Sequence, residues 1–333
     1  MTKVNNIIKL KPPAPSAAFN SYWRFAQKRQ QAFFARVEGQ AGPWSDDDII
    51  NQYKFTNAYR ASDRVSQYLI RHVIYPDNHD EIDFSAKDIL LRILLFKIFN
   101  KISTWQLLEQ HFGVINCANF DVERFDQVLD TAINSGQRIY SAAYIMPSGN
   151  QKKYGKIRKH RFHLQLIEHL LRSNLQRHLQ QCPTMAAGYQ QLLKIDSFGK
   201  FLAYQLITDI NYSELTNFSE MEFVMAGPGA LDGIRKCFTD LHQYSTSDTI
   251  KWMADNQQQQ FERLDLDFPS LFGRDLQLID CQNLFCEVDK YCRVAHPDIQ
   301  GISGRTRIKQ TFKPKSQPIE LFYPPKWQLN SRH

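Results

Sequence analysis

Acidic side chains beside a glycine-proline-glycine turn are the first residues of this chain whose types and spacing could do chemistry. The stretch "SEMEFVMAGPGALDGIRK" (219–236) places Glu220 and Glu222 a few residues before a turn that opens a predicted helix. A carboxylate near a sugar can stabilise the positive charge that develops when a base departs, or can activate water for attack. Both acids are therefore candidates for chemistry at a glycosidic bond.

A second motif lies about twenty residues earlier, in "LLKIDSFGKFLAYQLITDI" (192–210). Two apolar helical segments meet there at a tight turn, and a glycine-bearing turn of this kind lets backbone N–H groups and a helix N-terminus approach a DNA phosphate. An αα-hairpin without a ligand is the alternative. Helix-hairpin-helix DNA glycosylases place their acid at a comparable distance after the hairpin. Phe201 stands where a lyase would have its lysine, so if the chain is a glycosylase it is expected to be a monofunctional hydrolase.

Two further stretches are polar for segments of an otherwise apolar chain. "YKFTNAYRASDRVSQYL" (53–69) is predicted to place Asn57, Arg60 and Arg64 along one face of a helix. "DCQNLFCEVDKYCR" (280–293) places Glu287 and Lys290 on a polar stripe opposite an apolar one. Solvent-facing stripes with ion pairs are the alternative interpretation.

The charge of the chain favours a polyanionic partner. The formal net charge is +7, and basic residues cluster between residues 152 and 177 and again after residue 301. A solvated charged face explains such runs equally well. The clustering in two segments favours DNA, with backbone contacts expected from Lys152, Lys153, Lys156 and Arg158.

The sequence predicts no metal and no cofactor. Cys281, Cys286 and Cys292 lack the spacing of a zinc knuckle, and the pair His160 and His163 fits a structural role better. "GNQKKYGK" (149–156) has the wrong spacing for a phosphate-binding loop and lacks its Ser or Thr. No secretory signal and no membrane-spanning run are recognised, so a cytoplasmic location and no membrane partner are expected.

Helical periodicity dominates and predicts an all-α fold of two lobes. Helices are expected at about 16–39, 46–72, 84–99, 102–111, 121–136, 160–181, 184–193, 198–209, 228–242, 246–263 and 273–292. Ser85, and either Ser103 or Thr104, are expected N-caps. The loop "PSGNQKKYGK" predicts a boundary near residue 150. The expected domains are an N-terminal helical lobe (1–150), a helix-hairpin-helix lobe with the basic segment (151–300) and a basic C-terminal tail (301–333).

Taken together, these motifs resemble a known family. "PWSDDDIINQYKFTNAYRASDRVSQYL", "IYSAAYI", "GKFLAYQLITDINYS", "FVMAGPGALDGI" and "NLFCEVDKY" are similar to the helical domain shared by phage hydroxymethyluracil DNA kinases and α-glutamyl/putrescinyl-thymine pyrophosphorylases. The similar stretches run in the family's order from residue 43 to residue 291. The resemblance extends to helix-hairpin-helix DNA glycosylases, including a bacterial antiphage enzyme that removes glucosylated hydroxymethylcytosine.

The resemblance implies a set of site residues. The FTN-x-YR-x-x-DR and CE-x-DKY motifs and the "IYSAAYI" stretch give a base pocket of Phe55, Asn57, Tyr59, Arg60, Asp63, Tyr144, Asp289, Lys290 and Tyr291. The hairpin and the AGPG turn add the DNA-binding residues Ser197, Gly199, Lys200, Gly227 and Gly229. The catalytic acid stays open among Glu222, Asp209 and Glu287, because the chain lacks the Asp of better-known glycosylases in its usual context. Unlike the kinases, the chain lacks a P-loop domain.

The resulting hypothesis is a glycosylase-like fold that binds double-stranded DNA, expected to be phage DNA with hypermodified bases. It would excise a modified base, with glucosylated hydroxymethyl bases as the expected class, to leave abasic sites as a defence against phage. The alternatives are a transferase that builds a hypermodified thymine and a DNA-binding module without chemistry. The hypothesis predicts that the motifs around Asn57, Asp209, Glu222 and Glu287 converge on one cleft between the lobes, with the flipped base inside.

Overall fold

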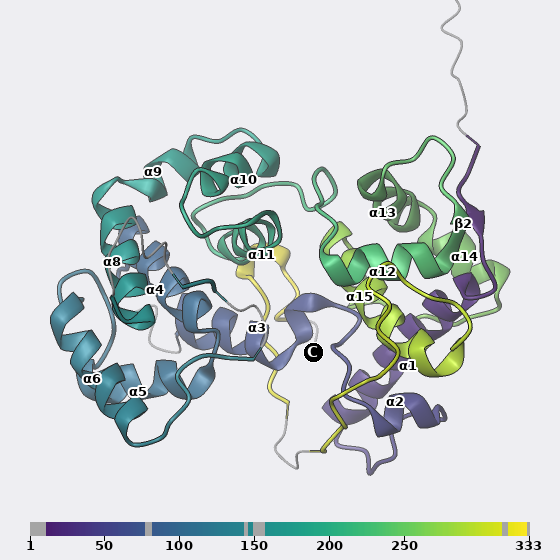
Figure 1. The fold of residues 1–333 in the computed structure, drawn as a ribbon, viewed down its shortest axis with the longest axis horizontal. Helices are drawn as coiled ribbons and strands as arrows, with labels where there is room; N and C mark the ends of the chain where they lie inside the picture. The colour runs from purple at the N-terminus through teal and green to yellow at the C-terminus, as the bar shows by residue number, and fades with distance from the viewer. Residues whose placement is uncertain (1–10, 77–81, 143–145, 149–156, 315–318, 332–333) are drawn as a thin grey trace, which may run out of the picture. The chain divides into compact units, whose positions relative to one another are not determined.

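The computed structural model describes residues 11–76, 82–142, 146–148, 157–314 and 319–331. The described part of the chain is predominantly α-helical, as the sequence predicts, with one two-stranded sheet (Figure 1). Contacts divide the chain into two compact units. Unit 1 comprises Met1–Arg60 and Val224–Glu320, and unit 2 comprises Ala61–Phe223 and Leu321–His333. No helix among the described residues is long and apolar enough to cross a membrane.

Unit 1 is built around helix α15 (Leu278–Ala295). Its other elements are β1 (Ala14–Pro15), α1 (Phe19–Val37), α2 (Asp48–Gln52), α12 (Pro228–Cys237), β2 (Phe238–Asp240), α13 (Thr246–Asp255) and α14 (Gln257–Arg263), and β1 pairs antiparallel with β2. Tyr22 and Trp23 of α1 are fully buried. The Tyr22 ring packs on Phe285 of α15 with centroids 4.7 Å apart, and the Trp23 ring packs on Phe261 of α14 at 5.1 Å. This aromatic cluster joins α1, α14 and α15.

Helices α12 and α15 approach each other so closely that two positions of α12 require glycine. A Cβ atom at Gly233 would lie 2.0 Å from the carbonyl oxygen of Phe285, and one at Gly229 would lie 2.1 Å from the Sγ atom of Cys286. Both separations are far inside van der Waals contact. The glycines of "AGPGALDG" therefore have a packing function, since they allow the two helix backbones to meet.

Unit 2 is built around helix α4 (Ala86–Phe99), which begins with a capping box formed by Ser85 and Asp88. Its other elements are α3 (Arg64–Tyr68), the π-helical segment η2 (Leu69–Ile74), α5 (Ile102–Phe112), α6 (Val122–Asn134), α8 (Lys159–Arg172), α9 (Leu175–Gln180), α10 (Met185–Leu193), α11 (Lys200–Ile210) and the 3₁₀ turn η4 (Pro325–Trp327). Helix α4 is apolar on nearly every face and, from Leu90 to Phe99, is buried at every position except Lys97, as expected for a central helix.

Arg92 and Lys97, two of the charged residues of α4, have side chains that are at most 10% exposed, and both have polar partners. Arg92 is 1% exposed and donates hydrogen bonds to the carbonyl oxygens of Val73 at 2.6 Å and Ile115 at 2.8 Å. Lys97 Nζ lies 3.1 Å from Asp209 Oδ2 of α11. Burial of a charge is tolerated only with such compensation, so both side chains fix the positions of segments that pack on α4.

The described part of the C-terminal segment is not a free tail. Tyr323 is fully buried, and its hydroxyl lies 2.9 Å from the Ser62 hydroxyl. Lys326 donates to the carbonyl oxygens of Ser213 at 2.8 Å and Thr216 at 2.6 Å. These contacts place residues 321–331 in unit 2, and the two units differ in their limits from the three domains expected at 1–150, 151–300 and 301–333.

Several predicted helices are shorter than expected. The stretch 160–181 forms α8 and α9, separated at Asn174, which has a left-handed backbone conformation. The stretch 246–263 likewise forms α13 and α14. The predicted cap at Ser85 is confirmed. The prediction of Ser103 or Thr104 as an N-cap is wrong, because α5 begins at Ile102 and its N-cap is Lys101.

Candidate functional site

The FTN motif lies on an extended loop of unit 1. After α2 ends, Tyr53 pairs with Thr311 in an antiparallel bridge, and the Lys54 N–H donates to the Gln310 carbonyl at 3.0 Å. The prediction of one helix over 46–72, with a polar face on Asn57, Arg60 and Arg64, is therefore wrong. Residues 310–312 supply the hydrogen bonds that a helix would have made within itself.

This loop runs beside Glu287 of α15. The Thr56 N–H donates to Glu287 Oε2 at 3.0 Å, and Lys290 Nζ lies 2.6 Å from the same oxygen. Glu287 is 7% exposed. Both of these contacts use Oε2 of Glu287. The hydroxyl of Thr56 is also buried, and it has no hydrogen-bond partner among the described residues. Two motifs that lie 231 residues apart in the sequence thus meet at one carboxylate.

Arg29 of α1 completes the polar side of this arrangement. Its Nη2 donates to Asn57 Oδ1 at 2.7 Å and its Nε donates to the Thr56 carbonyl at 3.0 Å. Aromatic rings form the other side, because the Phe55 ring lies 6.4 Å from that of Tyr291 and Lys290 Nζ lies 5.2 Å above the Phe55 ring. We call this arrangement the FTN cluster, which consists of Arg29, Phe55, Thr56, Asn57, Glu287, Lys290 and Tyr291.

Tyr59 and Arg60 are held in the interior of unit 1. The Tyr59 hydroxyl donates to the Arg274 carbonyl at 2.6 Å and accepts from the Leu271 N–H at 3.2 Å. Burial raises the pKa of Tyr59, so its hydroxyl is protonated at neutral pH. The Arg60 N–H donates to Asp280 Oδ1 at 2.7 Å. These contacts give both residues a structural role, and their predicted place in a base pocket stays a prediction.

The partners of Asp289 and Tyr291 differ from those of Glu287. Asp289 is 1% exposed and Lys236 Nζ of α12 lies 2.9 Å from its Oδ1, and Arg293 also binds it. The Tyr291 hydroxyl donates to Asp47 Oδ2 at 2.8 Å. Burial, followed by the neighbouring Asp47 carboxylate, raises the pKa of Tyr291. Asp289 therefore joins α12 to α15, which the motif alone does not indicate.

The other two candidate acids belong to unit 2. Asp209 is fully buried in α11, where it pairs with Lys97 at 3.1 Å. Glu222 is exposed, in the irregular segment that follows α11. Asp63 is the N-cap residue of α3, without a side-chain capping bond. The predicted convergence of these residues with Glu287 on one cleft stays a prediction.

The predicted hairpin exists in unit 2, where α10 and α11 flank the turn. Ser197 has a left-handed backbone with φ of 79°, and Gly199 is the N-cap of α11. Gly199 and Lys200 are exposed. In the AGPG turn of unit 1, by contrast, the Gly227 N–H donates to Gln282 Oε1 at 3.3 Å. The hairpin therefore offers accessible backbone, whereas one N–H of the AGPG turn is already satisfied.

Several predicted residues lie outside the described part of the chain. They are Tyr144, Lys152, Lys153 and Lys156. Arg158 is described, and it pairs with Asp130 of α6. Its predicted contact with DNA would have to compete with that pair.

The pKa values of Cys286, Cys292 and His163 are shifted in the directions expected of groups removed from solvent. Burial raises the pKa of both Cys286 and Cys292 to about 12, so these thiols are protonated at neutral pH. Burial lowers the pKa of His163 to about 4, and its ring nitrogens contact the Tyr140 hydroxyl at 2.7 Å and the Pro147 carbonyl at 3.0 Å. A protonated thiol is a poor ligand and a poor nucleophile.

Sequence reasoning missed two residues that hold this part of unit 1 together. Arg29 binds the FTN loop from α1, and Lys236 neutralises Asp289 from α12. Arg29 occurs in a helix rich in basic and glutamine residues, which is why its pattern resembles an ordinary solvated face. Lys236 is the last residue of the stretch 219–236, in which the glycines and acids are the residues that indicate a function.

Comparison with known proteins defines the class. The chain belongs to the family described as "5-hmdU DNA kinase, helical domain", whose model matches residues 16–301. It is similar to the 5-hmdU DNA kinase of Bacillus phage SP10, with 25% identity over 301 residues, which cover 84% of this chain and 46% of the phage protein. The chain thus spans about half the length of that relative. No solved structure matches. The predicted resemblance to the helical domain of the phage kinases is confirmed.

Proposed function

We propose that this chain acts on DNA that carries a modified pyrimidine, and that the FTN cluster handles the base. The relative from Bacillus phage SP10 is named for a kinase acting on 5-hmdU in DNA, which supports a modified base in DNA as the substrate class. The observation that carries the proposal is the meeting of the FTN loop with Glu287, where Thr56 and Lys290 both bind Oε2.

The cluster combines the groups needed to hold a flipped base. Tyr291, which is partly exposed, supplies aromatic surface for stacking and is backed by the buried Phe55 ring, and Asn57 supplies an amide for the polar edge of the base. Arg29 and Lys290 supply positive charge for a phosphate or for a hydroxyl-bearing substituent. Lys290 is held by Glu287, and Arg29 is held by the Asn57 side chain and the Thr56 carbonyl. The cationic groups are therefore positioned before substrate arrives, which reduces the entropy lost on binding.

The proposed reaction is hydrolysis of the N-glycosidic bond, with Glu287 as the catalytic carboxylate. The bond from the sugar C1′ to the base breaks, the water oxygen bonds to C1′, and a proton from water reaches the departing base. The Glu287 carboxylate stabilises positive charge on the sugar or orients that water. Asp209 is the weaker candidate because it is fully buried beside Lys97. Glu222 is also a weaker candidate, because its side chain is exposed and other groups would have to surround the sugar beside it.

A second candidate function is transfer of a group onto the modified base. The family relationship favours it, because the phage relative is named as a kinase, which is a transferase. In that case the FTN cluster would bind the base and a donor would supply the group.

Excision of glucosylated hydroxymethyl bases as an antiphage defence is the form of the hydrolase proposal that we favour. A DNA-binding module without chemistry is the remaining alternative.

One experiment separates these functions. Duplex DNAs containing thymine, 5-hydroxymethyluracil, hydroxymethylcytosine or glucosylated hydroxymethylcytosine are incubated with the full chain, and free bases and abasic sites are measured by mass spectrometry. We expect release of a modified base without any added donor. A mass increase on the DNA that requires an amine donor or a nucleoside triphosphate would instead establish the transferase.

The residue assignment is tested by Glu287→Gln, which keeps an acceptor for the Thr56 N–H and removes the charge. We expect base release to fall by at least about 100-fold, with DNA affinity and melting temperature nearly unchanged. Glu38→Gln removes an exposed carboxylate of the same unit and is the matched control. Full activity of Glu287→Gln would refute the assignment, and parallel Asp209→Asn and Glu222→Gln variants would then identify the acid.

A further inference from the structure

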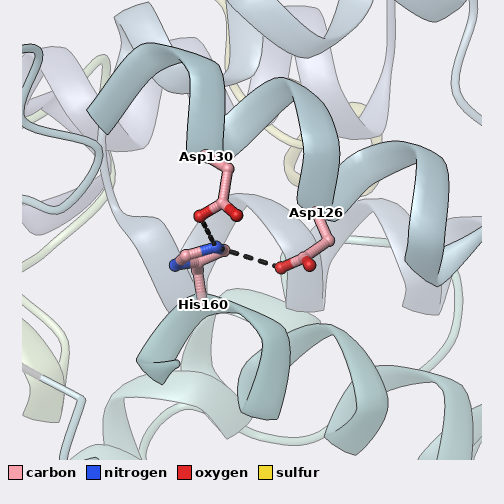
Figure 2. Close-up of side chains that lie close together, drawn as sticks. All are labelled: Asp126, Asp130 and His160. Carbon is pink, nitrogen blue, oxygen red and sulfur yellow. Dashed lines mark ion pairs between the residues drawn. The ribbon is translucent and has the colours of Figure 1, made fainter. Parts of the chain in front are cut away.

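A cluster of two carboxylates and one imidazole lies in unit 2 and contains none of the residues assigned above to the base or to catalysis. Asp126 and Asp130 are four residues apart on α6, so they share one helix face, and His160 projects toward them from the first turn of α8 (Figure 2). His160 Nε2 lies 3.0 Å from Asp126 Oδ1 and 2.9 Å from Asp130 Oδ1. The three ligand atoms all lie within 4.8 Å of one another.

Two of these three atoms are buried without a hydrogen bond. His160 is 3% exposed and Asp126 is 7% exposed. Neither His160 Nε2 nor Asp126 Oδ1 makes a hydrogen bond of acceptable geometry to any described residue, although the distances are short. One ring N–H points in a single direction within the ring plane, so it cannot serve two carboxylates at once. Unsatisfied buried polar atoms are costly, and an ion between the three atoms would satisfy all of them.

The spacing of the atoms fits a metal ion. In an octahedral shell with bonds of about 2.1 Å, adjacent ligand atoms lie about 3.0 Å apart. The separations from Nε2 to the two carboxylate oxygens are 3.0 and 2.9 Å. We propose that Asp126, Asp130 and His160 bind one divalent first-row transition cation, such as Mn²⁺ or Zn²⁺. The imidazole disfavours Mg²⁺ and Ca²⁺, which prefer oxygen ligands throughout.

The surroundings supply the outer contacts that a metal site needs. Arg161 Nη1 donates to Asp126 Oδ2 at 2.7 Å, which leaves Oδ1 directed at His160. Arg158 binds Asp130 from the start of the same helix. Such outer contacts fix the orientation of metal-binding carboxylates. They also bring positive charge close to the site, so cation binding depends on both acids being present.

Solvent can reach the site from one side. His160, Arg158 and Lys159 line an open cavity of about 660 Å³ together with Tyr140. Waters from this cavity can complete the coordination shell that the protein leaves open. The bound ion would link α6 to α8, since the two aspartates and the histidine lie on different helices, and it would therefore stabilise unit 2. The expectation from the sequence that the chain binds no metal is replaced by this proposal.

Metal binding is tested on the purified full chain after treatment with a chelator. Titration with Mn²⁺ and with Zn²⁺, followed by calorimetry and by equilibrium dialysis with elemental analysis, is expected to show one site per chain. His160→Gln and Asp130→Asn are expected to weaken binding more than about tenfold, and the cation is expected to raise the melting temperature of the wild-type chain more than that of either variant. His169→Gln removes an exposed imidazole from the same helix and is expected to leave binding unchanged.

Two outcomes would overturn the proposal. One is the absence of stoichiometric binding by the wild-type chain at millimolar Mn²⁺ and Zn²⁺. The other is an unchanged affinity in Asp130→Asn, a variant of a partly exposed residue that is expected to fold even if His160→Gln does not. A histidine that only pairs with the two carboxylates in its protonated form gives the first of these outcomes.

Discussion

Lys236 and Asp289 form an ion pair inside unit 1, with 2.9 Å between Nζ and Oδ1 and no more than 2% of either side chain exposed. Arg293 binds the same carboxylate. Asp289→Asn would leave the buried Lys236 and the largely buried Arg293 without this counter-charge, so we expect the free energy of unfolding to fall by about 3–5 kcal/mol. Lys236→Met should cost less, because Asp289 keeps Arg293. Urea denaturation measures both.

The matched control for this pair is the exposed ion pair between Arg172 and Glu168 of α8. Glu168→Gln is expected to change the free energy of unfolding by less than about 1 kcal/mol. If Glu168→Gln and Asp289→Asn lowered the free energy of unfolding by similar amounts, burial would not determine how much an ion pair contributes to stability.

The crossing of α12 and α15 predicts a difference between two glycines. Gly233→Ala places a Cβ atom 2.0 Å from a backbone oxygen, so the helices must separate, and a loss of more than about 3 kcal/mol is expected. Gly229→Ala meets the Cys286 side chain, and Cys286→Ala should recover part of its loss. Gly199→Ala meets nothing within 4 Å and should be nearly neutral for stability. Equal melting temperatures for the Gly233 and Gly199 variants would contradict this account.

His163 predicts a dependence of stability on pH. Burial lowers its pKa from 6.5 to about 4, so below pH 6.5 the unfolded chain binds a proton that the folded chain does not bind. Its contribution to stability is therefore complete above pH 6.5 and is lost as the pH falls toward 4, by on the order of 3 kcal/mol. His163→Gln should flatten the unfolding free energy over that range. His169→Gln is the control and should follow the wild-type curve.

DNA binding through the basic segment predicts a change in salt dependence. Replacing Lys152, Lys153 and Lys156 by Gln should weaken binding to all duplex sequences alike and should reduce the slope of log affinity against log salt by roughly 2–3. Fluorescence anisotropy at several salt concentrations measures the slope. Arg158 is left intact because it binds Asp130. An unchanged slope would remove this segment from the DNA interface.

Most helices could be predicted because their apolar spacing and caps are local properties of the sequence. Helix α4 is an example, since its apolar run and the capping box at Ser85 suffice to define it. The FTN loop could not be predicted in this way. Its polar residues repeat at helical spacing, but the hydrogen bonds that hold it come from residues 310–312 and from Glu287, which are more than 200 residues away.

The resemblance predicts the residue types of the candidate site, but it does not predict how those residues are arranged. The motif containing Glu287 and Asp289 suggests one group, whereas in the structure Glu287 contacts the FTN loop and Asp289 contacts α12. Asp126, Asp130 and His160 were not recognised as a group. The aspartates and the histidine lie on different helices, and only the packing of α6 against α8 brings them together.

The division of unit 1 into two sequence segments has a consequence for synthesis of the chain. Residues 61–223, which belong to unit 2, separate the first segment from residues 224–320. At about 5–20 residues per second, the ribosome needs roughly 10–30 s to produce that intervening stretch. During this interval Tyr22 and Trp23 of α1 have no α15 to pack against. The aromatic face of α1 is thus available to ribosome-associated chaperones for longer than any later part of unit 1.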